Sequence, residues 1–170
     1  MLSTSHRRTK LALLAGKHVL CEKPMALSED EAREMVQLAA GRRLILAVNH
    51  RLPHNAVHRK VREIVSSGRI GTVLAAQVSN TGLLHERLRG WRISEPRMGP
   101  GVILDLTSHD ASVLNPLLGM PLSVTCLAAA QAEWNSGEGT DSAVTLIEYR
   151  TEKGNRVFAQ TIDSFALPHA

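Results

Sequence analysis

The sequence predicts an α/β unit followed by an α+β unit. In the first part, helical and strand patterns alternate, with a helix over residues 6–15, an apolar strand over 19–21, a helix over 28–41 and a second apolar strand over 44–48. Short links between such elements require parallel strands with right-handed crossovers, and continuous apolar runs predict strands that are buried on both faces. After Arg51 this order changes, and the later strands are expected in a largely antiparallel sheet.

Glycine and capping residues set the boundaries of the first helices. Gly16 stands where the first helix should end, as glycine commonly does. Ser28 and Glu31 have the spacing of a capping box, in which each side chain accepts a backbone N–H group. The helix that begins there should end at Gly41, just before the second strand.

The second unit should contain two helices and at least four strands. We expect a helix from Pro53 to about Ser66, a strand over 71–80 and, after a loop of mixed charge, a helix from about Val102 to Leu118. Three further strands are expected near residues 122–130, 142–150 and 156–164, with a turn at 153–155 between the last two. We place the boundary near residue 51, which divides the chain into residues 1–51 and 52–170.

The composition excludes some functions. Aromatic residues make up 3% of the 170 residues, so few rings could stack on nucleic-acid bases. The net charge is +4, but the basic residues are scattered, which indicates solvated helix faces and no nucleic-acid partner. No stretch approaches the roughly 20 apolar residues of a membrane helix. Cys21 and Cys126 lie in apolar runs without metal-type spacing, which predicts buried free thiols in a reducing cytoplasm.

Lys23 is the first candidate site residue. It follows the apolar strand directly, with Glu22 before it and Pro24 after it. Open α/β sheets keep their ligand chemistry at the carboxyl ends of the strands, and the proline restricts the lysine to extended geometry. A lysine exposed to solvent at a strand end would fit the same pattern, so these residues alone leave both interpretations open.

Asp105 and His109 form a second candidate pair. Four residues apart on the predicted helix, they should share one face. A carboxylate can orient an imidazole, and histidine is the side chain best suited to proton transfer near neutral pH. Gly99 and Gly101 would let the backbone pass close to another group at the start of this helix. A surface pair or a core histidine would explain the same spacing.

Three histidines offer an alternative metal site. His50, His54 and His58 are spaced four residues apart and could chelate zinc on one continuous helix. Pro53 should start the helix after His50, however, and no cysteine or carboxylate joins the three. We therefore expect no metal.

Two segments carry a family resemblance. Residues 16–25, with the sequence Gly-Lys-His-Val-Leu-Cys-Glu-Lys-Pro-Met, resemble the Glu-Lys-Pro segment of the Gfo/Idh/MocA oxidoreductases. Residues 99–110 resemble the second signature of that family, at the family's usual separation from the first. Residues 49–50, 68–71 and 90–92 further resemble its 1,5-anhydro-D-fructose reductase branch. The resemblance covers nearly the whole chain. It implies the C-terminal part of a Rossmann-like parallel sheet, followed by a mostly antiparallel sheet with helices on one face.

The resemblance also implies roles for individual residues. His109 would exchange a proton with a substrate carbonyl or hydroxyl, Lys23 would stabilise negative charge on that oxygen, and Asp105 would position both substrate and histidine. A nicotinamide cofactor would carry the hydride, with NADP slightly favoured over NAD by the reductase branch. The residues implied in cofactor binding are Ser3, Thr4, His6, Glu22, Lys23, Asn49, Trp91 and Arg92.

The chain departs from the family pattern at several points. It has Gly99-Pro100-Gly101 where the family usually has three glycines, and the spacing from His6 to Gly16 is one residue short. No Gly-x-Gly-x-x-Gly segment occurs, although the family uses those glycines to bring the pyrophosphate to a helix N-terminus. The resemblance therefore implies a chain truncated at both ends, with a partial Rossmann domain and a partial substrate domain.

Two hypotheses for function follow. The first is a cytoplasmic NAD(P)-dependent oxidoreductase segment that acts on a sugar, a polyol or a related carbonyl compound. The second is a non-catalytic remnant or oligomerisation module of the same family. Under either hypothesis we expect no membrane partner and a homo-oligomer formed through the sheet face. The catalytic hypothesis requires Lys23, Asp105 and His109 to converge on one site.

Overall fold

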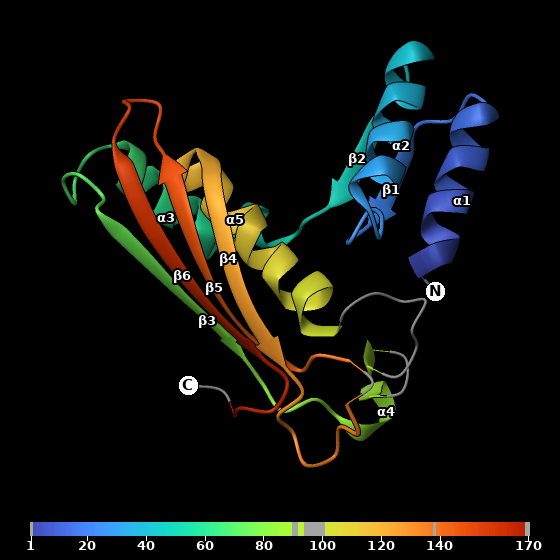
Figure 1. The fold of residues 1–170 in the computed structure, drawn as a ribbon. Coiled ribbons are helices and arrows are strands. Elements are labelled where there is room, and N and C mark those ends of the chain that lie inside the picture. Colours follow the sequence, from blue (N-terminus) through green and yellow to red (C-terminus); the bar gives the residue numbers. More distant parts are fainter. Residues whose placement is uncertain (1, 90–91, 94–100, 138, 169–170) are drawn as a thin grey trace.

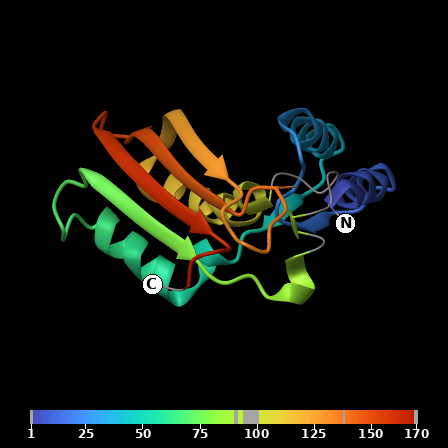
Figure 2. The ribbon, with the colours of Figure 1, turned by 60° about the horizontal axis from the view of Figure 1, so that its bottom comes forward.

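The computed structural model describes residues 2–89, 92–93, 101–137 and 139–168, and it contains a small and a large sheet (Figure 1). The small sheet and its helices comprise α1 (Leu2–Leu14), β1 (Val19–Glu22), α2 (Glu29–Gly41) and β2 (Leu46–Asn49). The large sheet and its helices comprise the 3-10 helix η1 (Leu52–His54), α3 (Ala56–Ser66), β3 (Ala75–Thr81), α4 (Glu86–Arg89), the π-helical turn η3 (Ile103–Thr107), α5 (Ser108–Leu118), β4 (Met120–Ala129), β5 (Ser142–Arg150) and β6 (Arg156–Ser164). The two sheets lie at opposite ends of the molecule (Figure 2).

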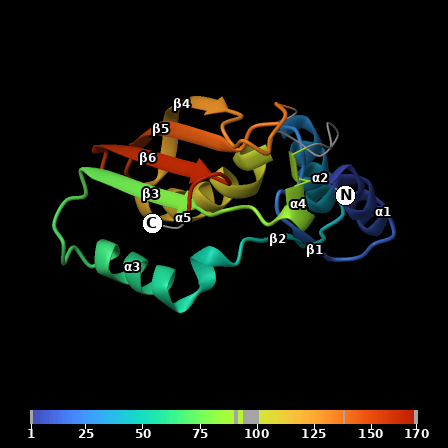
Figure 3. The same cartoon turned by 90° about the horizontal axis from the view of Figure 1, so that it is seen from below.

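The small sheet is parallel, with Glu22 opposite Asn49 at the carboxyl ends of its two strands. Helices α1 and α2 lie beside each other on the same side of this sheet (Figure 3). The sequence predicted strands buried on both faces, and this is wrong, because the side chain of Leu20 in β1 is 71% exposed. Within the described residues, helices cover one face of β1 and β2 and leave the other open.

The start of α2 follows its capping residues. Ser28 Oγ accepts the N–H of Glu31 at 3.2 Å, as the capping box predicts. The carboxylate of Glu31 accepts the N–H of Leu27 at 3.1 Å, one residue earlier than in the usual box. Helix α2 therefore begins at the predicted position with a shifted second hydrogen bond.

The large sheet has the strand order β3-β6-β5-β4, in which only β3 and β6 are parallel. Helices α3 and α5 lie on one face of it (Figure 1). Leu114 and Leu118 of α5 pack against Ile147 and Tyr149 of β5 and Val157 of β6, and this cluster forms the main core. The predicted fold class, a Rossmann-like parallel sheet piece followed by a mostly antiparallel sheet with helices on one face, is confirmed.

Some predicted elements differ in detail. The helix predicted from Val102 to Leu118 is not regular, because it passes through the π-helical turn η3 before α5 begins. The helix predicted from Pro53 is broken at Asn55, whose side chain accepts the N–H of His58 at 2.8 Å and caps α3. The short helix α4 lies in the segment predicted as a loop.

The two cysteines differ in environment. Cys21 is a buried free thiol, as predicted. Cys126 is free but exposed, so the prediction of burial was wrong there. Its strand, β4, is an edge strand whose residues are exposed along its whole length. None of the described helices combines the length and the apolar character that crossing a membrane requires.

Candidate active site

Lys23 joins the two halves of the described structure. It follows β1 directly, in a cis peptide bond with Pro24. Its Nζ donates to Asp105 Oδ1 at 2.6 Å and to the Asp105 carbonyl oxygen at 2.7 Å. The side chains of Lys23 and Asp105 are 14% and 19% exposed. The interpretation of Lys23 as a solvated strand-end lysine is therefore wrong.

Asp105 lies in η3 between two cations. Its second carboxylate oxygen, Oδ2, accepts a hydrogen bond from Arg92 Nε. Burial alone would raise the pKa of the Asp105 carboxyl, but the hydrogen bonds from Lys23 and Arg92 outweigh it and hold the pKa below its ordinary value. The carboxylate is therefore ionised at neutral pH, and it fixes both cations.

His109 is neutral at physiological pH. Burial is the largest cause that lowers its pKa, to about 4, and the charge of Lys23 lowers it further. Asp105 acts in the opposite direction, while His50 and Arg51 add smaller repulsive effects. The Nδ1 atom of His109 is buried without a hydrogen-bond partner among the described residues. The site therefore holds a neutral imidazole beside a lysine ammonium.

His50 and Arg51 belong to this site although the sequence analysis did not place them there. They follow β2 directly, just as Lys23 follows β1, so both segments end at the same edge of the parallel sheet. Burial lowers the pKa of His50, and Lys23 lowers it further. Its Nδ1 is also buried without a partner among the described residues. Their position immediately after the second apolar strand is the feature of the sequence that could have indicated a place in the site.

Glu22 and Asn49 lie opposite each other at that edge. Asn49 Nδ2 donates to Glu22 Oε1 at 2.8 Å, and the two residues are partners in the register of β1 and β2. The structure therefore brings together two of the residues predicted to bind the cofactor. Their role in binding stays a prediction.

The other residues predicted to bind the cofactor lie in a helix, contact other protein residues or lie outside the described residues. Ser3, Thr4 and His6 belong to helix α1, which begins at Leu2 and not at the predicted residue 6. His6 Nε2 lies 3.1 Å from Glu34 Oε2 of α2, so this side chain contacts the neighbouring helix. Arg92 is placed by its contact with Asp105, while Trp91, Gly99 and Pro100 lie outside the described residues.

No three histidine, cysteine or carboxylate side chains within the described ranges are grouped closely enough to hold a metal ion. His50 precedes η1, whereas His54 ends η1 and His58 lies in α3. The three histidines are thus not on one continuous helix, which removes the geometry that a zinc site on them would need.

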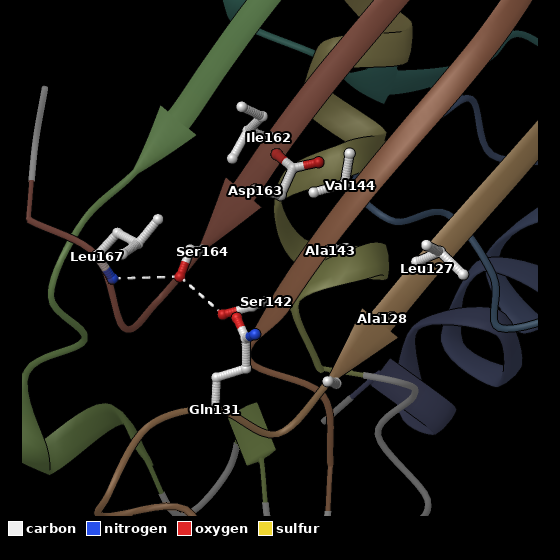
Figure 4. Close-up of a pocket in the computed structure, with 11 residues that line it drawn as sticks. Leu127, Ala128, Gln131, Ser142, Ala143, Val144, Ile162, Asp163, Ser164 and Leu167 are labelled. Atoms are coloured by element: carbon white, nitrogen blue, oxygen red, sulfur yellow. Dashed lines mark hydrogen bonds between the residues drawn. The ribbon is translucent and has the colours of Figure 1, made fainter.

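A hollow of about 230 Å³ lies away from these residues, on the large sheet (Figure 4). Two of its serines bond to each other: Ser142 Oγ and Ser164 Oγ are 2.9 Å apart, and Leu167 N donates to Ser164 Oγ at 3.2 Å. Apolar side chains of the strands form most of the rest of its wall, among them Leu127, Val144 and Ile162. None of Lys23, Asp105 and His109 lines this hollow.

The strand-end lysine, the ionised carboxylate and the neutral imidazole lie together at the edge of a parallel α/β sheet, an arrangement whose chemistry can serve proton transfer. Comparison with known families agrees with this class of protein. The chain belongs to the Gfo/Idh/MocA family, because the family's C-terminal domain model matches residues 58–162 and the model described as "Oxidoreductase family, NAD-binding Rossmann fold" matches residues 3–50. The family resemblance read from the sequence is confirmed.

Curated relatives include several oxidoreductases. The chain is 40% identical to 1,5-anhydro-D-fructose reductase of Ensifer adhaerens over 97% of its own length and 49% of that protein. It is 31% identical to inositol 2-dehydrogenase of Pseudomonas savastanoi pv. phaseolicola over 90% of its length and 44% of that protein. The chain thus spans about half the length of the curated relatives it matches.

Solved structures share the fold. GenD2 from gentamicin A biosynthesis, in complex with NAD, matches with a TM-score of 0.85 and 25% identity, over 98% of this chain and 46% of that one. Aldose-aldose oxidoreductase from Caulobacter crescentus, complexed with glycerol, matches with a TM-score of 0.86 and 21% identity, over 98% of this chain and 49% of that one. The second likeness supports the fold alone.

Proposed function

We propose that this chain carries the proton-transfer site of an NAD(P)-dependent oxidoreductase that acts on a sugar or polyol. The observation that supports this most directly is the contact of Lys23 with Asp105, at 2.6 Å, beside the neutral imidazole of His109. Lys23 and Asp105 meet although they are 82 positions apart in the chain, and His109 follows Asp105 by four residues. A bound nicotinamide supplies or accepts the hydride.

The chain's own residues handle the proton and the charge. His109 is neutral at pH 7, so it can accept the proton of a substrate hydroxyl during oxidation and return it to the oxygen during reduction. Lys23 has three N–H donors, and it can donate to the same oxygen while it keeps its contact with Asp105. Asp105 holds the lysine in place and favours the protonated imidazole that forms during oxidation.

Two buried ring nitrogens fit a bound polar molecule at this edge. The Nδ1 atoms of His50 and His109 have no hydrogen-bond partner among the described residues, and buried polar atoms normally find one. Glu22 and Asn49, at the ends of β1 and β2, would lie along the nicotinamide nucleotide, with Arg92 beside it. Trp91 is proposed as a cofactor-binding residue by family resemblance alone. Ser3, Thr4 and His6 are proposed on the same cofactor by family resemblance.

The relatives narrow the substrate and the cofactor. The 40% identity to a 1,5-anhydro-D-fructose reductase supports a cyclic sugar ketone or the corresponding polyol as substrate. NADP is proposed ahead of NAD on the resemblance of the sequence to the reductase branch alone. We also propose that the protein acts in the cytoplasm, and that residues 1–51 and 52–170 form the cofactor part and the substrate part. The open face of the large sheet is the proposed contact between copies of the chain.

Turnover measurements test this function. Purified protein is mixed with NADPH or NADH and 1,5-anhydro-D-fructose, and with NADP or NAD and inositols, while nicotinamide absorbance is followed. Lys23→Met and His109→Gln should each lower kcat by roughly 10²- to 10⁴-fold, because each removes a group that acts on the reacting oxygen.

The control is His54→Gln, which alters an exposed histidine at the end of η1. It should leave kcat within about twofold, since surface substitutions away from a site have small effects. A protein that neither binds a reduced nicotinamide in a fluorescence titration nor turns over any of these substrates would support the remnant hypothesis instead.

A further inference from the structure

Two carboxyl side chains meet in the interior on the sheet side of α5. Asp110 follows His109 in α5 and is 3% exposed, and Asp163 lies in β6 and is fully buried. Asp110 Oδ1 accepts a hydrogen bond from Asn80 Nδ2 of β3 at 3.2 Å. Asp163 Oδ2 accepts from Thr107 Oγ1 of η3 at 2.7 Å and from Thr161 Oγ1 of β6 at 3.1 Å. Four elements therefore converge on this pair.

The other oxygen of each carboxyl group is buried without a hydrogen-bond partner in the described part of the chain. These atoms are Asp110 Oδ2 and Asp163 Oδ1. The donors recorded on the pair are an amide and two hydroxyl groups, all of them neutral. Two ionised carboxylates cannot share such a site at low cost, because each charge is desolvated and repels the other. One proton between the two orphan oxygens would satisfy both atoms and remove one charge.

We propose that Asp110 and Asp163 share one proton in the folded protein, and that this carboxyl pair positions the junction of η3 and α5 against β6. Thr107, which donates to Asp163, lies between Asp105 and His109 in the chain. The pair thereby fixes the segment that presents those two residues to Lys23. The proposal of a shared proton does not depend on the proposed function, whereas the catalytic importance of the positioned segment rests on it.

The electrostatics of the surroundings agree with a protonated pair. Burial is the largest cause that raises the pKa of Asp110, to about 8, and repulsion from Asp163 is the next. From β5, Tyr149 faces the same region, and burial together with the charge of Asp110 raises its pKa. The polar groups that bond to the carboxyl pair are Asn80 from β3, Thr107 from η3 and Thr161 from β6. In this proposal Asp110 is a positioning residue, because it acts on the site through Asp163.

The sign of the pH dependence follows from linkage. The pKa of Asp110 in the folded protein lies above its unfolded value of 3.8, so between about pH 4 and pH 8 the folded state binds one proton more than the unfolded state. Stability from this proton is fully present below that window, and it is lost as the pH rises through it. For this group alone, the unfolding equilibrium constant should increase about tenfold per pH unit.

Asp110→Asn tests the shared proton. The variant's amide can donate to Asp163 in place of the proton, without titrating. Between pH 5 and 7.5, the logarithm of the unfolding constant should rise less steeply in the variant than in the unmodified chain, by about one per pH unit. Equal slopes would overturn the proposal. This measurement needs neither cofactor nor turnover. A negative result would therefore count against the shared proton and not against the proposed function.

A second measurement uses the unmodified chain, in case the variant does not fold. At pH 6.5, ordinary carboxyl groups are ionised, so a protonated carboxylic acid gives an isolated carbonyl band in the infrared spectrum. We expect such a band at pH 6.5 and its loss by pH 9.5, and its absence at pH 6.5 would overturn the proposal.

Positioning is tested by the titration of His109, followed by NMR. Asp110→Asn should keep the pKa of His109 near 4, because its amide holds the junction in place. Asp110→Ala removes the group that faces Asp163, so His109 should become more exposed and its pKa should move toward 6.5. The same pKa in both variants would contradict the positioning role.

Discussion

Lys23 donates hydrogen bonds to both the carboxylate and the carbonyl oxygen of Asp105. The same ammonium charge acts on His109 and His50, and it lowers the pKa of each. Burial is the larger cause for both imidazoles, and the lysine charge adds to it. One side chain therefore fixes an acid and further lowers the pKa of two imidazoles, whereas a neutral donor could make the hydrogen bonds without the electrostatic effect.

Replacing Lys23 should change the titration of His109. In Lys23→Met the burial of the imidazole remains, but the repelling charge is gone and Asp105 still attracts a proton. The pKa of His109 should therefore rise from about 4 toward 6.5, which an NMR titration of its imidazole measures. Lys10→Met is the matched control, because Lys10 pairs with Glu34 on the surface. Lys10→Met should leave the pKa of His109 unchanged. An unchanged pKa of His109 in Lys23→Met would contradict the electrostatic effect of Lys23 on this imidazole.

At the scale of single residues, the sequence singled out three side chains that meet in the structure but not the groups that surround them. Lys23, Asp105 and His109 could be singled out because strand ends and helix spacing carry local information. His50, Arg51 and Asp163 could not be assigned, because their effects depend on which segments meet in space. The placement of His6 against Glu34 was missed for the same reason.

The element that carries Asp105 and His109 is held at its start by a loop. Asp141, fully buried, accepts the backbone N–H groups of Gln131 and Ala132 at 3.0 Å and so closes the loop that joins β4 to β5. The Thr140 carbonyl of that loop accepts the N–H of Val102 at 3.0 Å. The sequence predicted that Gly101 allows a close approach, and the group that approaches it is this backbone.

Gly101→Ala should therefore disturb the start of η3. Gly101 has φ +50°, and an added Cβ would lie 2.0 Å from the Thr140 carbonyl oxygen. Left-handed strain and overpacking together should lower the free energy of unfolding by about 2–4 kcal/mol. Gly68→Ala is the control, since Gly68 has φ +73° with nothing within 4 Å, and it should cost about 1 kcal/mol. Urea denaturation measures both, and equal losses would contradict the role of the contact.

Local patterns predicted where most elements begin and end but not how they are distorted. Ser28 fixes the start of α2 within a few residues of sequence, so its cap was predictable. The π-helical turn η3 could not be predicted from local sequence, because its residues contact Lys23 and Asp163, which are distant in the chain. The exposure of Cys126 was missed because an apolar run does not reveal that its strand lies at an edge.

At the scale of the whole molecule, the large sheet has one covered face and one open face. We call the exposed side chains of Leu127, Val144, Leu146 and Phe158 the open apolar face. Val144 and Leu146 of β5 and Phe158 of β6 alternate along their strands with buried residues, several of which pack on α5. Leu127 of β4 is the cross-strand partner of Val144, so the exposed apolar side chains extend over three neighbouring strands. Such a surface favours association of copies through the same patch on each.

A charge on the open apolar face should prevent that association. In a two-fold dimer each substitution occurs twice, and burying one leucine contributes about 1.5–3 kcal/mol, so Leu146→Lys should weaken dimerisation at least ~100-fold. Sedimentation velocity over a range of concentrations measures this. Leu11→Lys is the matched control, because Leu11 on α1 and Leu146 are both 56% exposed and only Leu146 is on this face. A monomeric unmodified chain would exclude this face as the contact. Equal effects of both substitutions would also exclude it, because a general loss of apolar surface would then account for the weaker association.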